Sequence, residues 1–528
     1  MTFDILIQGG TVIDGSESAE SMRADVGVTG DTIAAVGDLS AAGAARVIDA
    51  TGKVVCPGFI DMHTHSDFTT LATPTADSKI RSGVTTEVIG QCGASAFPLR
   101  GETFKRRAAS YLKSDGLDVT WHDVDGYLAE AETRGCSVNR IPMVGHNTIR
   151  GSVMGYVDRA PTPDELKAMV REVEIALEAG AFGLSTGLVY PPGCYATTDE
   201  VVALCRPVAD AEGVYASHIR SEGDDLEEAV NEVLAIHDRA GVPVHISHLK
   251  VSRQHNWHKI DWLRERLFAA IDAGADLTAD RYPYTAASTG LDSLLPDWVY
   301  EGTEQDMVDR LSDGDTRDRI REETRVHLTD ADWESAVVSS CAESKNRRYE
   351  GRRLVDIARE WSMDPFDALC ELLIADGGRT QGVFFRMKEE NLREILSWPF
   401  VMIGSDGSSR SADDAMTSGK PHPRSYGTST RVLARYVREN PVMSIENAVW
   451  KLSGFPSQRL GLANRGRIAH TMKADIVIFD PLAVADEATY EEPHRYSVGI
   501  DHVLVAGVPA ITDGRHTGAL AGRVLKRG

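Results

Sequence analysis

The sequence lacks the features of a membrane-spanning or exported chain. No run approaches the roughly 18 apolar residues that a membrane span requires. The start, MTFDILI, has neither the basic section nor the following apolar section of a signal peptide. We therefore expect a cytoplasmic protein with no membrane partner.

Basic residues are scarce relative to acidic ones. The chain has 56 Lys and Arg against 79 Asp and Glu, a formal net charge of −23. An average surface of this charge repels nucleic acid and anionic lipid. We expect no nucleic-acid partner, although acidity alone does not define a substrate.

Cysteine and proline are also infrequent. The seven cysteines are an odd number scattered along 528 residues, which argues against a disulfide framework. With 21 prolines, 42% hydrophobic residues and no evident internal repeat, the composition is that of a well-packed enzyme. At most one or two of these cysteines should have chemical roles.

Short apolar segments between turn residues mark both ends of the chain. They occupy 5–7, 24–28 and 47–49 near the start, and 474–479, 502–507 and 524–525 near the end. Each group is too small to bury a core alone. We predict that residues 1–57 and 466–528 pair into one small β-sandwich.

The middle of the chain alternates short apolar strands with amphipathic helices, a pattern typical of parallel βα units. In one such helix, Leu226, Val230, Val233 and Leu234 repeat at helical spacing. Eight strand-like segments are present, and their ends lie at 58–65, 86–92, 142–146, 182–187, 214–218, 242–248, 276–282 and 400–406. This pattern predicts an α/β fold, a (β/α)8 TIM barrel over residues 58–465.

One gap between these strands is too long for a single helix. Residues 285–345, between the seventh and eighth strands, are rich in charge. We predict an inserted helical subdomain there. Because insertions after barrel strands lie on the catalytic face, it is a candidate lid.

Metal-competent side chains end several of the predicted strands, where a TIM barrel carries its active site. His63 and His65 are two residues apart, so strand periodicity points both the same way. Cys92 lies between glycines at the end of the second strand. A His-x-His at a strand edge and a buried cysteine are the structural alternatives.

Three further side chains end later strands. His218 and His248 close consecutive strands about one βα unit apart, and Asp406 follows the eighth strand. Each histidine alone is equally compatible with a place in the core, and the Gly-Ser-Asp-Gly sequence around Asp406 is also a common turn. Together these groups suit zinc, with a carboxylate beside it as base. His245, on the other face of its strand, is the better candidate for a structural histidine.

The motifs around these residues resemble the amidohydrolase superfamily. The resemblance covers nearly the full chain and is carried by 58–65, His218, His248, Asp406 and the late segment 466–477. Within the superfamily, the segments 90–93, 145–147, 183–188, 217–220 and 247–250 are similar to the D-aminoacylases, also called N-acyl-D-amino-acid deacylases. This implies zinc-dependent hydrolysis of N-acyl-D-amino acids.

The resemblance also implies ligand roles. Many superfamily members carry a carboxylated lysine on strand four, but 183–186 contains none. In D-aminoacylases a cysteine takes that bridging place, which Cys92 occupies here. By resemblance, Cys92, His218 and His248 hold a tightly bound zinc ion. His63, His65 and Asp406 frame a second, weaker metal position, and Asp406 serves as the catalytic base.

The substrate carboxylate requires cationic or hydroxyl partners. The resemblance and position past strand ends nominate Lys250, Tyr282 and Ser288, with Arg220 as a further candidate. An acidic substrate side chain would need another cation, for which Arg220, Arg253, Arg281 and Arg386 are available. The loop 190–193 is either part of the acyl or side-chain pocket or a rigid turn.

Two alternatives stay open at this point. Another amidohydrolase, acting on cyclic amides, N-acyl dipeptides or toxins, would use the same metal chemistry. A non-catalytic scaffold with this fold should have lost several ligands, whereas all six positions are filled here. Side-chain preference, the number of working metals and oligomeric state are not indicated by the sequence.

Overall fold

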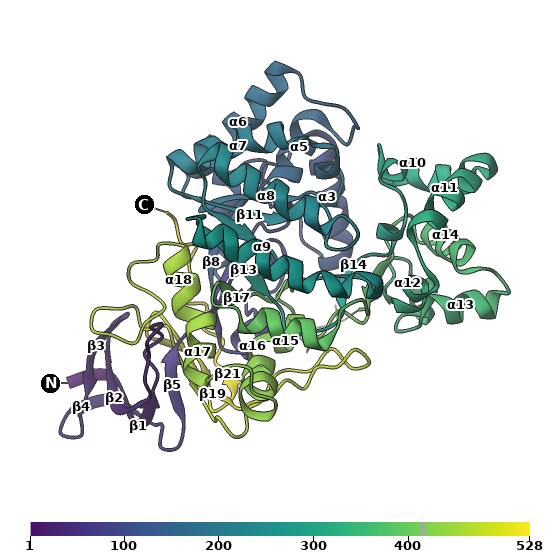
Figure 1. The fold of residues 1–528 in the computed structure, drawn as a ribbon. Helices are drawn as coiled ribbons and strands as arrows, with labels where there is room; N and C mark the ends of the chain where they lie inside the picture. Colours follow the sequence, from purple (N-terminus) through teal and green to yellow (C-terminus); the bar gives the residue numbers. More distant parts are fainter. Residues whose placement is uncertain (1, 413–417, 528) are drawn as a thin grey trace.

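The computed structural model describes residues 2–412 and 418–527. A β-sheet from both chain ends packs beside a barrel of strands and helices, and a mainly helical unit projects from the barrel (Figure 1). No helix in these described ranges is long and apolar enough to cross a membrane.

The two ends of the chain share one nine-stranded sheet. Its strands are β1 (Thr2–Val12), β2 (Met22–Thr29), β3 (Thr32–Gly37), β4 (Gly43–Asp49), β5 (Val54–Pro57), β18 (Ile476–Phe479), β19 (Ile500–Val505), β20 (Val508–Thr512) and β21 (Arg515–His516). The N-terminal and C-terminal strands meet where β5 pairs antiparallel with β18. β5 leads directly into the first barrel strand, so this pairing anchors the start of the barrel.

The expectation for 524–525 is wrong. Val524 does not join the terminal sheet but bridges to Arg140 at the barrel. Arg140 donates its backbone N–H to the carbonyl of Arg523 at 2.9 Å, and Leu525 donates to the carbonyl of Arg140 at 2.8 Å. Two apolar residues in sequence predict a strand but not which sheet accepts it.

Parallel strands form the barrel, and each of the eight predicted segments overlaps at least one of them. They are β6 (Phe59–Asp61), β7 (Val84–Ile89), β8 (Asn139–Pro142), β9 (Val144–Gly145), β10 (Gly183–Gly187), β11 (Val214–His218), β12 (Val244–Ile246), β13 (Leu277–Arg281) and β17 (Val401–Ile403). β8 and β9 belong to one predicted segment, interrupted at Met143. A parallel bridge between Thr64 and Gly407 joins the first strand's extension to the last.

Helices surround these strands with apolar faces turned inward. In α8 (Leu226–Ala240), Leu226, Val230, Val233 and Leu234 are all buried, which confirms the predicted face. The other helices used below are α3 (Gly101–Asp115), α5 (His146–Met154), α6 (Pro163–Glu178), α7 (Thr198–Asp210) and α16 (Arg424–Arg431).

The inserted unit is longer than the predicted 285–345 and is not purely helical. It contains β14 (Ala287–Gly290), α10 (Glu304–Ser312), α11 (Gly314–His327), α12 (Asp330–Ser335), β15 (Ala336–Ser340), α13 (Leu354–Trp361), α14 (Pro365–Ala375) and β16 (Gln381–Phe384). The strands form an antiparallel sheet in the order β14-β16-β15. Strands of four or five residues carry too short a pattern to be distinguished from helix in the sequence.

Candidate metal centre

Cys92 is the centre of the histidine cluster. Its Sγ lies 3.2 Å from Nε2 of His63, 3.4 Å from Nε2 of His248 and 3.6 Å from Nδ1 of His218. These four residues come from the ends of four barrel strands. The structure therefore brings together the sulfur and three of the four predicted histidine ligands at one point.

The remaining predicted ligands lie beside this point. Nε2 of His65 is 2.9 Å from Oδ1 of Asp406, and Nε2 of His63 is 3.5 Å from the same oxygen. The ligand atoms of His63, Cys92, His248 and Asp406 all lie within 4.8 Å of one another. A thiol, imidazoles and a carboxylate at this spacing fit zinc.

Three of these side chains sit on unusual backbone. Cys92, His248 and Asp406 have φ angles of 52°, 37° and 52°, in the left-handed region that non-glycine residues seldom adopt. Such conformations cost about 1–3 kcal/mol each and cluster at functional sites. Gly187 permits the close approach at Cys92, because a Cβ there would lie 2.3 Å from the Cys92 carbonyl oxygen.

Electrostatics separate Cys92 from the other buried cysteines. Burial alone raises the pKa of a thiol, as at Cys205. At Cys92 the charges of His63 and His248 and hydrogen bonds from the histidines outweigh burial and hold the pKa well below its usual value. A thiolate is the form that binds metal.

Asp280 contacts the histidines on the side away from Cys92. The sequence did not lead us to predict this residue. Its Oδ2 lies 3.1 Å from Nδ1 of His63 and 2.9 Å from Nε2 of His245, and its Oδ1 accepts the backbone N–H of His248 at 3.0 Å. A carboxylate on the outer nitrogen of a metal-binding histidine fixes the ring orientation. Its position at the end of strand seven was the available signal. His245 also contacts Thr278 and so lies behind the cluster.

Glu222 is a second missed residue. Its Oε1 lies 2.9 Å from Nδ1 of His248 and 3.8 Å from Nε2 of His218, and it pairs with Nζ of Lys250. Burial would raise the pKa of Glu222, but Lys250 and the two histidines hold it well below its usual value. Its position four residues after His218 was the only sequence signal. Glu222, His218 and His248 form a second potential metal-binding group.

Arg424 is the third missed residue. Its Nη1 lies 2.8 Å from Oδ2 of Asp406, and its guanidinium lies 4.9 Å from the ring centre of Tyr282. Lys250 approaches the same ring at 5.5 Å. Tyr282 is fully buried, and its hydroxyl has no hydrogen-bond partner among the described residues. Two cations therefore lie against the ring of Tyr282, and one of them, Arg424, also pairs with Asp406.

A cavity of about 360 Å³ opens above the cluster. His65, Cys92, His218, His248 and Asp406 line it, together with Arg107, Asn147, Tyr190, Ser288 and Arg424. Tyr190 packs edge-on against His218, with ring centres 4.9 Å apart, so the loop 190–193 borders the cavity. Ser288, on β14, donates its hydroxyl to the Gly382 carbonyl at 3.1 Å.

The structure does not support Arg220 as a substrate ligand. Its guanidinium pairs with Glu232 at 3.0 Å and donates to the carbonyls of Cys194 and Ala196 at 2.9 and 3.0 Å. It is not among the residues that line the cavity, and neither are the buried Lys250 and Tyr282, but these two lie beside Arg424 or its ring partner rather than facing away. The chain leaves strand β11 after His218, so strand periodicity no longer fixes the direction of residue 220.

The chain is similar to known proteins over most of its length. A model of the amidohydrolase family matches residues 46–321 and 391–511. D-aminoacylase from Alcaligenes xylosoxydans xylosoxydans is 38% identical over 525 residues, 99% of this chain and 98% of that protein.

Solved structures show the same similarity. One, from work on the functional role of the binuclear metal centre in D-aminoacylase, has a TM-score of 0.84 at 37% identity and covers 99% of this chain and 100% of that one. Another is N-acyl-D-glutamate deacylase from Bordetella bronchiseptica with zinc and a phosphonate mimic of the tetrahedral intermediate. It has a TM-score of 0.83 at 34% identity and covers 100% of both chains.

Proposed function

The chain belongs to the amidohydrolase family, and from that premise we propose that it hydrolyses N-acyl-D-amino acids to a carboxylate and a free D-amino acid. The observation that carries this proposal is Cys92, surrounded by His63, His218 and His248 at 3.2 to 3.6 Å. Similarity to D-aminoacylase and to N-acyl-D-glutamate deacylase along the whole chain supports the substrate class.

The proposed cofactor is zinc. Cys92, His218 and His248 would hold one ion tightly, while His63, His65 and Asp406 frame a second, weaker position. Zinc, when bound, supplies Lewis-acid chemistry that polarises the acyl carbonyl and makes water more acidic. Asp280 and Glu222 would keep the rings of His63 and His248 oriented for this purpose.

Asp406 is the proposed general base. Burial opposes its ionisation, but Arg424 and the histidines hold its pKa well below the usual value, so it is a carboxylate at neutral pH. It would take a proton from the attacking water as the new C–O bond forms. It would then return that proton to the amide nitrogen as the C–N bond breaks, which leaves no covalent enzyme intermediate.

The α-carboxylate would lie on the other side of Asp406. Its proposed partners are Lys250, Arg424 and the hydroxyls of Tyr282 and Ser288, since two cations with two hydroxyls suit a carboxylate. Arg424 and Ser288 line the cavity, and Lys250 and Arg424 lie against the ring of the buried Tyr282. We further infer that the nine-stranded terminal sheet folds as a small β-sandwich and that the inserted unit from β14 to β16 acts as a lid over this cavity.

A substrate panel tests the proposal. The zinc-loaded protein should hydrolyse N-acetyl-D-leucine or N-acetyl-D-glutamate, leave the L-enantiomers intact, and not open hydantoin or dihydroorotate. Cleavage of cyclic amides alone would identify a different amidohydrolase. A folded, zinc-free protein with no activity on any amide would support the scaffold alternative.

A further inference from the structure

Arg107 is a cation in the catalytic cavity on the side opposite the proposed carboxylate site. It lies on α3, which follows the second barrel strand, while Thr148 and Tyr156 line the same cavity after the third. Lys250 follows strand six and Ser288 follows strand seven. In a ring of eight strands, the second and sixth are four places apart and so face each other across the barrel.

The other cations near the reacting atoms have carboxylate partners, but Arg107 has none within ion-pair distance among the described residues. Arg424 pairs with Asp406, and Lys250 pairs with Glu222. Burial opposes the charge of Arg107, but Tyr111, Tyr156 and the more distant Asp67 raise its pKa, so the side chain is a cation. The Asp67 carboxylate accepts the Gly90 N–H at 3.1 Å instead.

The four arginines that the sequence offered for an acidic side chain are engaged elsewhere. Arg220 is held by Glu232, as described above. Arg253 pairs with Asp332 at 2.8 Å, Arg281 donates to the Tyr284 carbonyl at 2.8 Å, and Arg386 donates to the Ser335 hydroxyl at 3.2 Å. None of the four lines the catalytic cavity.

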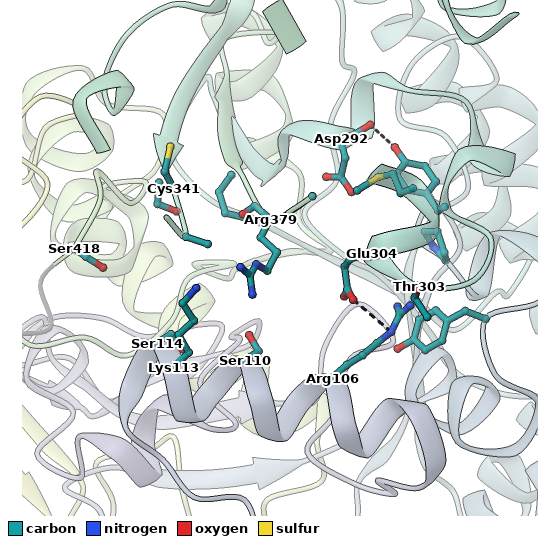
Figure 2. Close-up of a pocket in the computed structure, with 18 of the residues that line it drawn as sticks. Arg106, Ser110, Lys113, Ser114, Asp292, Thr303, Glu304, Cys341, Arg379 and Ser418 are labelled. Carbon is teal, nitrogen blue, oxygen red and sulfur yellow. Dashed lines mark hydrogen bonds and ion pairs between the residues drawn. The ribbon is translucent and has the colours of Figure 1, made fainter. Parts of the chain in front are cut away.

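A second space, beside the catalytic cavity, is also lined by cations. This larger space of about 550 Å³ lies between α3 and the inserted unit and shares Tyr156, Pro191 and Gln381 with the catalytic cavity. Arg106, Lys113, Arg347 and Arg379 line it, against the acidic Asp292 and Glu304. Lys113 and Arg379 point into this space (Figure 2).

Nearby carboxylates partly neutralise the positive charge that lines this second space. Arg106 lies 3.8 Å from Glu304, and Lys113 and Arg379 share Glu343 at 2.9 and 3.3 Å. In a chain of net charge −23, the basic lining of this space, which adjoins the catalytic cavity, is a local reversal of charge. Such a reversal draws in anions.

We propose that Arg107 binds a second carboxylate of the substrate, at the end away from the α-carboxylate. The guanidinium fork matches a carboxylate through two parallel hydrogen bonds. A substrate held by its α-carboxylate near Lys250 and Arg424, with its amide at the metal centre, extends its remaining groups toward strands two and three. The second carboxylate belongs either to the D-amino acid side chain or to the acyl group. This inference rests on the proposed function and narrows its substrate class.

Pairs of matched substrates test, in the wild-type protein, whether a second carboxylate is recognised. N-acetyl-D-glutamate is compared with N-acetyl-D-glutamine, and N-succinyl-D-leucine with N-butyryl-D-leucine. We expect kcat/KM to favour the dianionic member of one pair by about 10- to 100-fold, as for one charge-assisted contact. The pair that shows the preference identifies the carrier as side chain or acyl group. Turnover of these substrates with no preference in either pair would overturn the inference and leave the proposed function intact, whereas no turnover of any N-acyl-D-amino acid would remove the proposed function itself.

Variants then test whether Arg107 causes the preference for the dianionic substrate. Arg107→Met should abolish it through a higher KM for the dianionic substrate, Arg107→Lys should retain part of it, and Lys105→Met, exposed on the same helix, should keep all of it. Zinc content and thermal unfolding establish that each variant is folded. An unchanged preference in folded Arg107→Met refutes the assignment, and the wild-type comparison stands even if that variant fails to fold.

Discussion

Arg424 and Asp406 form a buried ion pair in which Nη1 lies 2.8 Å from Oδ2, while Oδ1 of the same carboxylate faces His65 at 2.9 Å. The two oxygens of the proposed base therefore have different partners. One faces the metal centre and the other faces the group proposed to bind the substrate. Arg424 thus connects substrate binding to the orientation of Asp406.

Replacement of Arg424 should impair both substrate binding and the positioning of Asp406. We expect Arg424→Met to lower kcat/KM for N-acetyl-D-leucine by about 100-fold, because a charge-assisted contact to a buried carboxylate is lost. Steady-state kinetics on N-(3-methylbutyl)acetamide, which is N-acetyl-leucine without its α-carboxylate, separate the two roles. A loss confined to N-acetyl-D-leucine indicates carboxylate binding, and a loss on both compounds indicates positioning of Asp406. Unchanged kinetics on both would contradict the assignment.

Cys92 should be required for metal binding and not for folding. In Cys92→Ala we expect zinc content to fall to near zero and hydrolysis to the uncatalysed background, because the sulfur that three histidines surround is gone. Metal analysis and circular dichroism measure the two effects. Cys205→Ala, at a buried cysteine on α7, should retain zinc and activity. A fully active Cys92→Ala protein would remove this ligand assignment.

Strand-end positions explain why much of the site could be predicted. The spacing of apolar segments predicts eight strands. A TIM barrel carries its active site at the C-terminal ends of its strands, so the residues at those ends are the candidates. Cys92, His218 and His248 are separated by up to 156 residues in the chain but meet at one point for that reason. The D-amino-acid substrate came only from family resemblance.

Of the residues that escaped prediction, Asp280 lies at the end of a barrel strand, whereas the others lie outside this regular pattern. Glu222 and Arg424 follow strands in loops or helices whose direction depends on tertiary packing. The direction of Arg220 depends on packing for the same reason, because the chain leaves the strand at His218 and the side chain turns toward Glu232. Arg107 is one of several basic residues on α3, and only the fold shows that it lines the cavity.

Glu222 should affect the metal through His248. We expect Glu222→Gln to weaken zinc affinity and lower activity by about 10- to 100-fold, since partners of ligating histidines act at this scale. A zinc titration with a competing chelator measures the affinity, and excess zinc should restore part of the activity. Glu228→Gln, exposed on α8, is the matched control. Equal zinc affinity in all three proteins would show that Glu222 does not act on the metal.

Glu87 should make stability fall as pH rises. It is fully buried, and although Lys79 and the Ser66 hydroxyl favour its ionised form, burial raises its pKa from 4.5 to about 7. Between these values the folded protein binds a proton that the unfolded chain has lost. The stabilisation is therefore present at low pH and is lost as pH rises through about 7.

Glu87→Gln should remove this loss, because the amide stays neutral and its oxygen can still accept from Ser66. Relative to wild type, the free energy of unfolding of the variant should improve by about 2 kcal/mol between pH 5 and pH 8. Urea denaturation at the two pH values measures the change, with the exposed Glu132→Gln as control. If Glu87→Gln and wild type keep the same difference at both values, the carboxyl does not titrate in this range. The control is needed because the other carboxyl groups also titrate and change the free energy of unfolding of every protein. Only a change seen in Glu87→Gln and absent from Glu132→Gln measures the cost of an ionised Glu87 in the core.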